Sequence, residues 1–152
     1  MKLILFNPSH EVAIKNYQLD DLTFSSLPET VIMNRQAHYN PILGMVEGKL
    51  VCFFILDEGE DRQYYSQTPN SLLLRAFSSD SREVRKGYAL QSLQLLPDFI
   101  KVHFPHIDKV VLGVNERNEP AANLYLKAGF IDTKRKYLGP KGYQRIFSLS
   151  LS

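Results

Sequence analysis

The chain has 152 residues, of which 44% are hydrophobic and 22% are charged, and its 18 basic and 16 acidic residues leave a formal net charge of +2. This length predicts a single domain over residues 1–152, with enough apolar side chains to build a core. The charge is too small to indicate nucleic-acid or membrane-surface binding, and no apolar run approaches the ~18 residues of a transmembrane helix.

The N-terminal half predicts short elements joined by turns. Gly48 separates two apolar runs and supplies the permissive backbone that a hairpin turn needs. In chain order, the expected elements are a strand at Lys2–Asn7, one or two short helices within Glu11–Leu22, hairpin strands at Ile42–Val46 and Leu50–Leu56, a polar loop at 57–70 and a strand at Ser71–Phe77. The acidic residues at 57–61 are interpreted as a solvated surface, although such a loop could also attract a cationic amine.

The C-terminal half shows clearer periodicity. Apolar residues recur every three or four positions from Leu90 to Phe104 and predict a helix that is kinked or split at Pro97. Asn118 is a good N-cap and Gly129 a good C-terminal stop for the next helix. The expected elements are a helix from Arg85, a strand at Lys109–Val114, a helix at Asn118–Ala128, and strands at Ile131–Tyr137 and Gln144–Leu151. This order predicts a mixed sheet with helices packed on it.

The segment Arg85-Lys86-Gly87-Tyr88-Ala89-Leu90 follows a strand and opens a helix. Gly87 has no Cβ, so an oxygen atom of a phosphate can approach its backbone closely. The unpaired N–H groups and the dipole of a helix start favour an anion there, and Arg85 and Lys86 add charge at the rim. An ordinary helix start with a packing glycine explains the segment equally well when it is taken alone.

The second segment, Asn118 to Phe130, discriminates better. Ala121, Leu124 and Tyr125 share one face of the predicted helix, and Asn118 lies on that face one heptad before Tyr125. A core tyrosine with a satisfied hydroxyl would explain Tyr125 by itself. A phenol with a pKa of about 10 can, however, donate a proton to a departing thiolate whose conjugate thiol has a pKa of about 8.5.

Together, these segments resemble the GNAT superfamily of N-acetyltransferases. Residues Val84–Ala89 are similar to its acyl-CoA pyrophosphate loop, Arg/Gln-x-x-Gly-x-Gly/Ala, and Asn118–Phe130 are similar to its Asn-x-x-Ala-x-x-Leu-Tyr-x-x-x-Gly-Phe segment. Arg75–Asp80 resembles the end of the strand before the loop, and the resemblance covers about residues 42–150. Val84 departs from the family pattern and removes one side-chain contact, for which Arg82 or Arg85 could substitute.

The resemblance implies an α/β (α+β) fold with a mixed, mostly antiparallel sheet of about six or seven strands and helices on both faces. Strands ending at Phe77 and Val114 would splay apart and form the acyl-CoA cleft. The implied cofactor-binding residues are Phe77, Ser78, Ser79, Arg85, Lys86, Gly87, Tyr88, Ala89, Leu90 and Asn118, with Tyr125 as the general acid.

The implied reaction is direct transfer of an acetyl group from acetyl-CoA, the cosubstrate, to a primary amine of a small molecule or peptide. No carboxylate on the strand ending at Phe77 is a convincing general base, so Asp80, Asp132 and a water chain stay open. A protein that binds CoA as a sensor or assembly module without turnover is the alternative, and Val84 and the missing carboxylate motivate it.

Other partners and the location are predicted from simple features. His103 and His106 lack a carboxylate or cysteine partner, so no metal site is expected. Cys52, the only cysteine, lies in a buried-strand pattern, and the apolar N-terminus is too short for a signal peptide, so a cytoplasmic location is expected. Exposed edge strands allow a homodimer, and neither nucleic acid nor a membrane is an expected partner.

Overall fold

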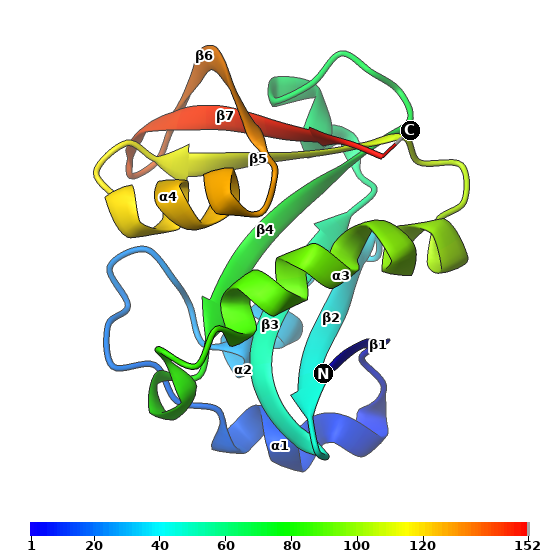
Figure 1. The fold of residues 1–152 in the computed structure, drawn as a ribbon, viewed down its shortest axis with the longest axis vertical. Helices are drawn as coiled ribbons and strands as arrows, with labels where there is room; N and C mark the ends of the chain where they lie inside the picture. Colours follow the sequence, from blue (N-terminus) through cyan, green and yellow to red (C-terminus); the bar gives the residue numbers. More distant parts are fainter. Residues whose placement is uncertain (152) are drawn as a thin grey trace.

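A computed structural model describes residues 1–151, and a seven-stranded sheet crosses it in the order β1-β2-β3-β4-β5-β7-β6 (Figure 1). Every neighbouring pair is antiparallel except β4 and β5, which are parallel. The strands are β1 (Lys2–Leu5), β2 (Tyr39–Val46), β3 (Lys49–Asp57), β4 (Ser71–Ser79), β5 (Lys109–Asn115), β6 (Ile131–Gly139) and β7 (Gly142–Ser150). The mixed, mostly antiparallel sheet confirms the predicted fold class.

Helices cover both faces of this sheet, as predicted. The helices are α1 (Glu11–Asn16), α2 (Pro28–Met33), α3 (Tyr88–His103) and α4 (Glu119–Lys127), and short 3-10 turns occur at η1 (Pro8–His10), η2 (Glu60–Tyr64) and η3 (Ser81–Glu83). No helix within residues 1–151 is both long and apolar enough to span a membrane.

The two faces of the sheet build two apolar cores because side chains alternate along a strand. On one face, Phe54 of β3 packs in a core that contains Leu96 of α3 and Tyr125 of α4. On the other face, Phe53 packs in a smaller core with Ile14 of α1. The sheet is therefore buried from both sides along β3, which explains why that strand reads as a continuous apolar run.

α3 is one continuous helix across Pro97, so of the two predicted alternatives, a kink or a split, the split is wrong. A proline inside a helix removes one backbone donor. Here Leu93 and Leu96 before the proline and Ile100 after it are all buried in the same core, and their burial stabilises the helix on both sides of the proline. The apolar stripe, rather than the proline, decides the structure of this segment.

The prediction of a uniformly solvated acidic loop at 57–61 is also corrected. Asp57 is the last residue of β3 and is fully buried. Its carboxylate accepts a hydrogen bond from Arg75 of β4 at 3.0 Å, and the same guanidinium nitrogen donates to Asp61 at 3.1 Å. The buried charge is tolerated because it is paired and hydrogen-bonded.

β4 and β5 separate shortly after they pair. Their pairing covers Ser71–Leu73 against 109–111, and beyond it the two strands no longer share a register. On its other edge, β4 carries a bulge against β3, with Ala76 at a φ of 57°. An extra residue bends a strand and increases its twist, so the bulge turns the end of β4 away from β5. The predicted splayed strand pair is thereby confirmed.

The core contribution of α3 can be tested by Leu96→Ala. Leu96 is fully buried, so truncation should lower the free energy of unfolding by about 3 kcal/mol through lost burial and a residual cavity. Val102→Ala is the matched control on the same helix, because Val102 is 74% exposed and should change stability by less than about 0.5 kcal/mol. Urea unfolding measures both, and equal effects would contradict the assigned packing of α3.

Candidate active site

A cleft of about 280 Å³ opens where β4 and β5 part. One wall comes from the face that α3 and α4 cover, with Ala89, Leu124 and Tyr125. The other comes from the segment between α1 and α2, with Phe24 and Ser25. The remaining lining residues are Leu74–Phe77 and Ser79 of β4, Gly113–Asn115 of β5, Asn118 and Ala121. The cleft therefore reaches both faces of the sheet.

Tyr125 of α4 lines this cleft although the residue is largely buried. The residue is only 7% exposed, and its ring meets Phe77 and Phe130 edge-on with centroids 6.1 and 5.7 Å away. Its hydroxyl makes no hydrogen bond within residues 1–151. Every fully buried side-chain oxygen in that part of the chain has a hydrogen-bond partner, so the hydroxyl of Tyr125 must retain some contact with solvent. Burial raises the pKa of Tyr125, so the phenol is fully protonated at neutral pH.

Asn118 starts α4 and also lines the cleft. Its Oδ1 caps the helix by accepting the N–H of Ala121 at 3.3 Å. Its Nδ2 donates to no residue within 1–151, so one side-chain donor is available at the cleft wall. The predicted cap is confirmed, and the same residue is placed to contact a ligand.

The loop before α3 presents a row of backbone donors. Within residues 1–151, the N–H groups from Arg85 to Leu90 have no protein acceptor. Arg85 and Gly87 both have left-handed backbones, with φ of 66° and 81°. Left-handed residues and a helix start together form the kind of concave array of N–H groups that binds phosphate. Arg85 is exposed, and its side chain makes no hydrogen bond or ion pair within the described chain.

A buried carboxylate anchors this loop on its upstream side. Asp80 accepts the backbone N–H, Nε and Nη2 of Arg82 at 2.8–3.0 Å, and also accepts the N–H of Gln18 at 3.2 Å. Burial alone would raise the pKa of Asp80, but these hydrogen bonds outweigh it and lower the pKa. Because Arg82 also donates to the carbonyl of Asn16, it is committed to this anchor and does not replace the side chain that Val84 lacks.

The structure brings most predicted site residues to the cleft and its edge. Lining it are Phe77, Ser79, Ala89, Asn118 and Tyr125, while Arg85, Lys86, Gly87, Tyr88 and Leu90 lie in the loop and helix start that adjoin Ala89. Ser78 is the exception. It is buried on the other side of β4, where its hydroxyl shares a 2.9 Å hydrogen bond with Tyr17, so its side chain does not line the cleft.

Sequence reasoning missed Gly113, Phe24 and Ser25, which also line the cleft. Gly113 of β5 is a glycine for a physical reason, because a Cβ there would overlap Oε1 of Gln144 and lie 2.6 Å from the ring of Tyr65. The Tyr65 hydroxyl donates to that same Oε1 at 3.0 Å. A glycine inside a β-branched strand was the available signal, since it often marks close approach of another group. Phe24 and Ser25 had no comparable signal.

Neither predicted general base lies in the cleft. Asp80 is held in the anchor above, and Asp132 of β6 pairs with Arg145 at 2.8 Å. The pKa of Asp132 is lowered, chiefly by the hydrogen bond from Arg145, so this carboxylate is a weak base. Within residues 1–151, no group of three or more His, Cys, Asp or Glu side chains could hold a metal ion.

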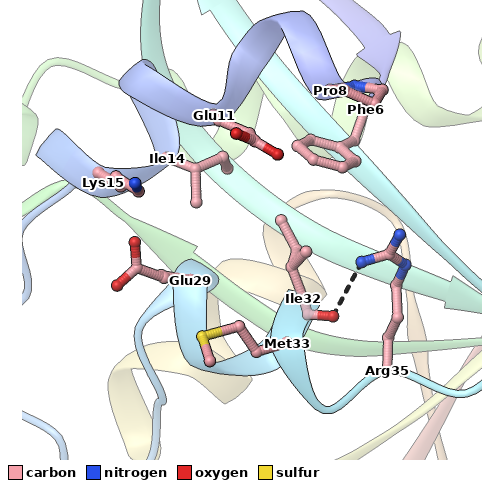
Figure 2. A pocket seen from close by; sticks show the side chains of 9 residues that line it. All are labelled: Phe6, Pro8, Glu11, Ile14, Lys15, Glu29, Ile32, Met33 and Arg35. Atoms are coloured by element: carbon pink, nitrogen blue, oxygen red, sulfur yellow. Dashed lines mark hydrogen bonds between the residues drawn. The ribbon is translucent and has the colours of Figure 1, made fainter.

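A second hollow, of about 290 Å³, lies between α1 and α2 (Figure 2). Phe6, Ile14 and Ile32 form its apolar floor, and the guanidinium of Arg35 donates to the carbonyl of Ile32 at 2.9 Å. Its rim carries two carboxylates and two cationic side chains, so it presents no net charge to a ligand. None of the predicted site residues lines it.

Comparisons with known proteins agree with this geometry. No family model matches the chain. A Bacillus subtilis (strain 168) protein named uncharacterized N-acetyltransferase YbbJ is 36% identical to it over 152 residues, covering 96% of this chain and 94% of the relative. The chain belongs to the GNAT superfamily of N-acetyltransferases. The resemblance inferred from its two motifs is therefore confirmed, and acetyl-CoA is the cosubstrate of this family.

Solved GNAT structures share the fold at low sequence identity. The aminoglycoside acetyltransferase AAC(6')-Ib, solved with paromomycin and acetyl-CoA, superposes with a TM-score of 0.76 at 14% identity over 97% of this chain and 92% of that chain. The Escherichia coli ribosomal-protein-S18-alanine N-acetyltransferase gives a TM-score of 0.70 at 19% identity, covering 99% and 94%. The Vibrio cholerae spermidine N-acetyltransferase SpeG, as a variant, gives 0.69 at 15%, covering 99% and 94%.

The loop geometry predicts the effect of Gly87→Ala on this GNAT protein. A left-handed alanine costs about 1–2 kcal/mol, so the loop should shift and weaken acetyl-CoA binding about fivefold, as one or two N–H contacts to phosphate are lost. Gly142→Ala is the control, because its φ of 112° also disfavours alanine but it lies in the β6–β7 turn. Calorimetric titration with acetyl-CoA distinguishes the variants, and equal dissociation constants would remove the loop from the binding site.

Proposed function

We propose that this protein transfers an acetyl group from acetyl-CoA directly to the primary amine of a small molecule or a peptide. The observation that carries the proposal is the cleft between β4 and β5, which has a buried, protonated phenol on one wall and a loop of unpaired N–H groups at its edge. An anion-binding loop and a proton donor are the two features that a thioester with a pyrophosphate tail requires.

The binding roles follow from the position of each group. The N–H groups from Arg85 to Leu90 bind the pyrophosphate, with the helix dipole of α3 and the Arg85 side chain adding positive potential. Backbone groups of Phe77 and Ser79 pair with the pantetheine arm, since the end of β4 has no β5 partner there. The free amide of Asn118 contacts the arm from the opposite wall.

Tyr125 acts as general acid. The acceptor nitrogen attacks the thioester carbonyl, a C–N bond forms, the C–S bond breaks, and the departing thiolate takes the proton of the Tyr125 hydroxyl. Because the thiol has the lower pKa, this proton transfer is unfavourable by itself and is driven by conversion of the thioester to the more stable amide. The raised pKa of the buried phenol keeps it protonated until the thiolate forms, and the tyrosinate then regains a proton from water. The nitrogen loses its own proton to water in the open cleft, since no carboxylate is among the residues that line it within the described chain.

The acceptor enters from the wall formed by Phe24 and Ser25. The opposite wall is occupied by the groups that hold acetyl-CoA, so only this side is left for the amine. The printed names of related proteins cover aminoglycosides, spermidine and an alanine of a ribosomal protein, which makes these three amine types the natural first panel. A cytoplasmic, single-domain enzyme that forms a homodimer through an edge strand completes the proposal.

Replacing Tyr125 with Phe tests the proposed mechanism. With acetyl-CoA and the three amine types, wild-type protein should release free thiol and form an acetylated product that mass spectrometry detects. Tyr125→Phe should lower kcat about 100-fold and leave the KM for acetyl-CoA nearly unchanged, because only the proton donor is lost. Tyr143→Phe removes a hydroxyl from an exposed tyrosine and should match wild type.

Two results would contradict this account. Unchanged kcat in Tyr125→Phe would exclude the phenol from the mechanism. Thermal stabilisation by acetyl-CoA, with no product from any amine, would favour the alternative of a CoA-binding sensor or assembly module. That alternative is supported by Val84, which is 49% exposed and offers no polar side-chain group at the position where the family pattern has Arg or Gln.

A further inference from the structure

A single buried carboxylate joins the phosphate-binding loop to a distant hairpin. The side chain of Glu83 is 5% exposed, and one of its oxygens accepts Nζ of Lys86 at 2.6 Å. Its other oxygen pairs with Nζ of Lys49, the first residue of β3. Glu83 therefore ties the loop to the β2–β3 turn, which no sequence motif connects with cofactor binding.

The loop needs such support because of its backbone. Arg85 has a left-handed backbone, which is disfavoured for a residue with a Cβ, and no residue within 1–151 accepts the N–H groups that follow it. Its conformation is therefore not maintained by its own hydrogen bonds. Two buried carboxylates hold it from outside, Asp80 on the upstream side and Glu83 immediately before the turn.

The same cluster supplies positive charge at this place. Lys49 and Lys86 share one carboxylate, so the three residues leave one net positive charge, and both lysine side chains are more than half exposed. Position 84, where the GNAT pattern has Arg or Gln, is occupied by an exposed valine. The hydrogen bonds from both lysines lower the pKa of Glu83, so its carboxylate stays ionised at neutral pH.

We propose that Glu83 is a positioning residue: by holding Lys49 and Lys86 it fixes the loop around Arg85, and these two lysines supply the phosphate-facing charge that Val84 does not. This inference rests on the proposed function, because its ligand is the phosphate part of acetyl-CoA. It adds a residue of the β2–β3 hairpin to the cosubstrate site.

Glu83→Gln separates positioning from simple charge, because the two predict opposite signs. Removing a negative charge beside an anion site should tighten binding if charge alone matters. If Glu83 positions the loop and lysines, acetyl-CoA should bind about fivefold more weakly despite the more favourable charge. Glu47→Gln is the matched control, because it removes the same charge from an exposed residue of the same hairpin that has no partner within 1–151.

A second pair of variants tests the proposal even if Glu83→Gln does not fold. Lys49→Gln alters an exposed lysine and should weaken acetyl-CoA binding about threefold. Lys15→Gln removes the same charge from α1 and should have no effect. Calorimetric titration gives the dissociation constants and thermal melting checks the fold. The kcat at saturating acetyl-CoA should stay at the wild-type value in the two controls, Glu47→Gln and Lys15→Gln, because neither residue belongs to the proposed site.

The outcomes distinguish this inference from the function on which it rests. Wild-type protein that fails to bind acetyl-CoA overturns the proposed function itself. If wild-type protein binds, equal or tighter binding by Glu83→Gln overturns the positioning role. The same holds if Lys49→Gln and Lys15→Gln bind acetyl-CoA equally well. Weaker binding by Glu83→Gln, with Glu47→Gln unchanged, supports the role.

Discussion

β4 and β5 run side by side over Ser71–Leu73 and then part, and this separation creates the space in which acyl transfer can occur. The bulge at Ala76 bends β4, and Phe77 beyond it stacks on Phe54 of β3 with centroids 5.6 Å apart. That contact holds the bent strand against the larger core. Without the separation, the sheet would pair continuously and no cleft would reach both of its faces.

The loop before α3 shows how a locally unfavourable conformation persists. Backbone donors with no acceptor and a left-handed arginine are costly, yet both are useful at an anion site. Asp80 and Glu83 stabilise the loop from outside by pairing with cationic side chains. The free N–H groups therefore stay available for a ligand because other residues fix the backbone around them.

Burial gives Tyr125 two roles at once. Its ring fills the core between α4 and the end of β4, so the helix is placed by ordinary apolar packing. The same burial raises the pKa of the hydroxyl and keeps the phenol protonated at neutral pH. A residue that looks like a core tyrosine in the sequence also lines the cleft, where we propose it as the proton donor, so the two interpretations of Tyr125 do not exclude each other.

The sequence by itself determined the features that depend on neighbours within a few positions. These include the β2–β3 hairpin, the capped helix that begins after Asn118, the two GNAT motifs and the alternation of strands and helices. Contacts between distant residues decided the rest: α3 continues through Pro97, Asp57 is buried against Arg75, and Phe24 closes the second wall of the cleft. Local patterns cannot encode these outcomes, because each depends on which remote side chains the folded sheet brings together.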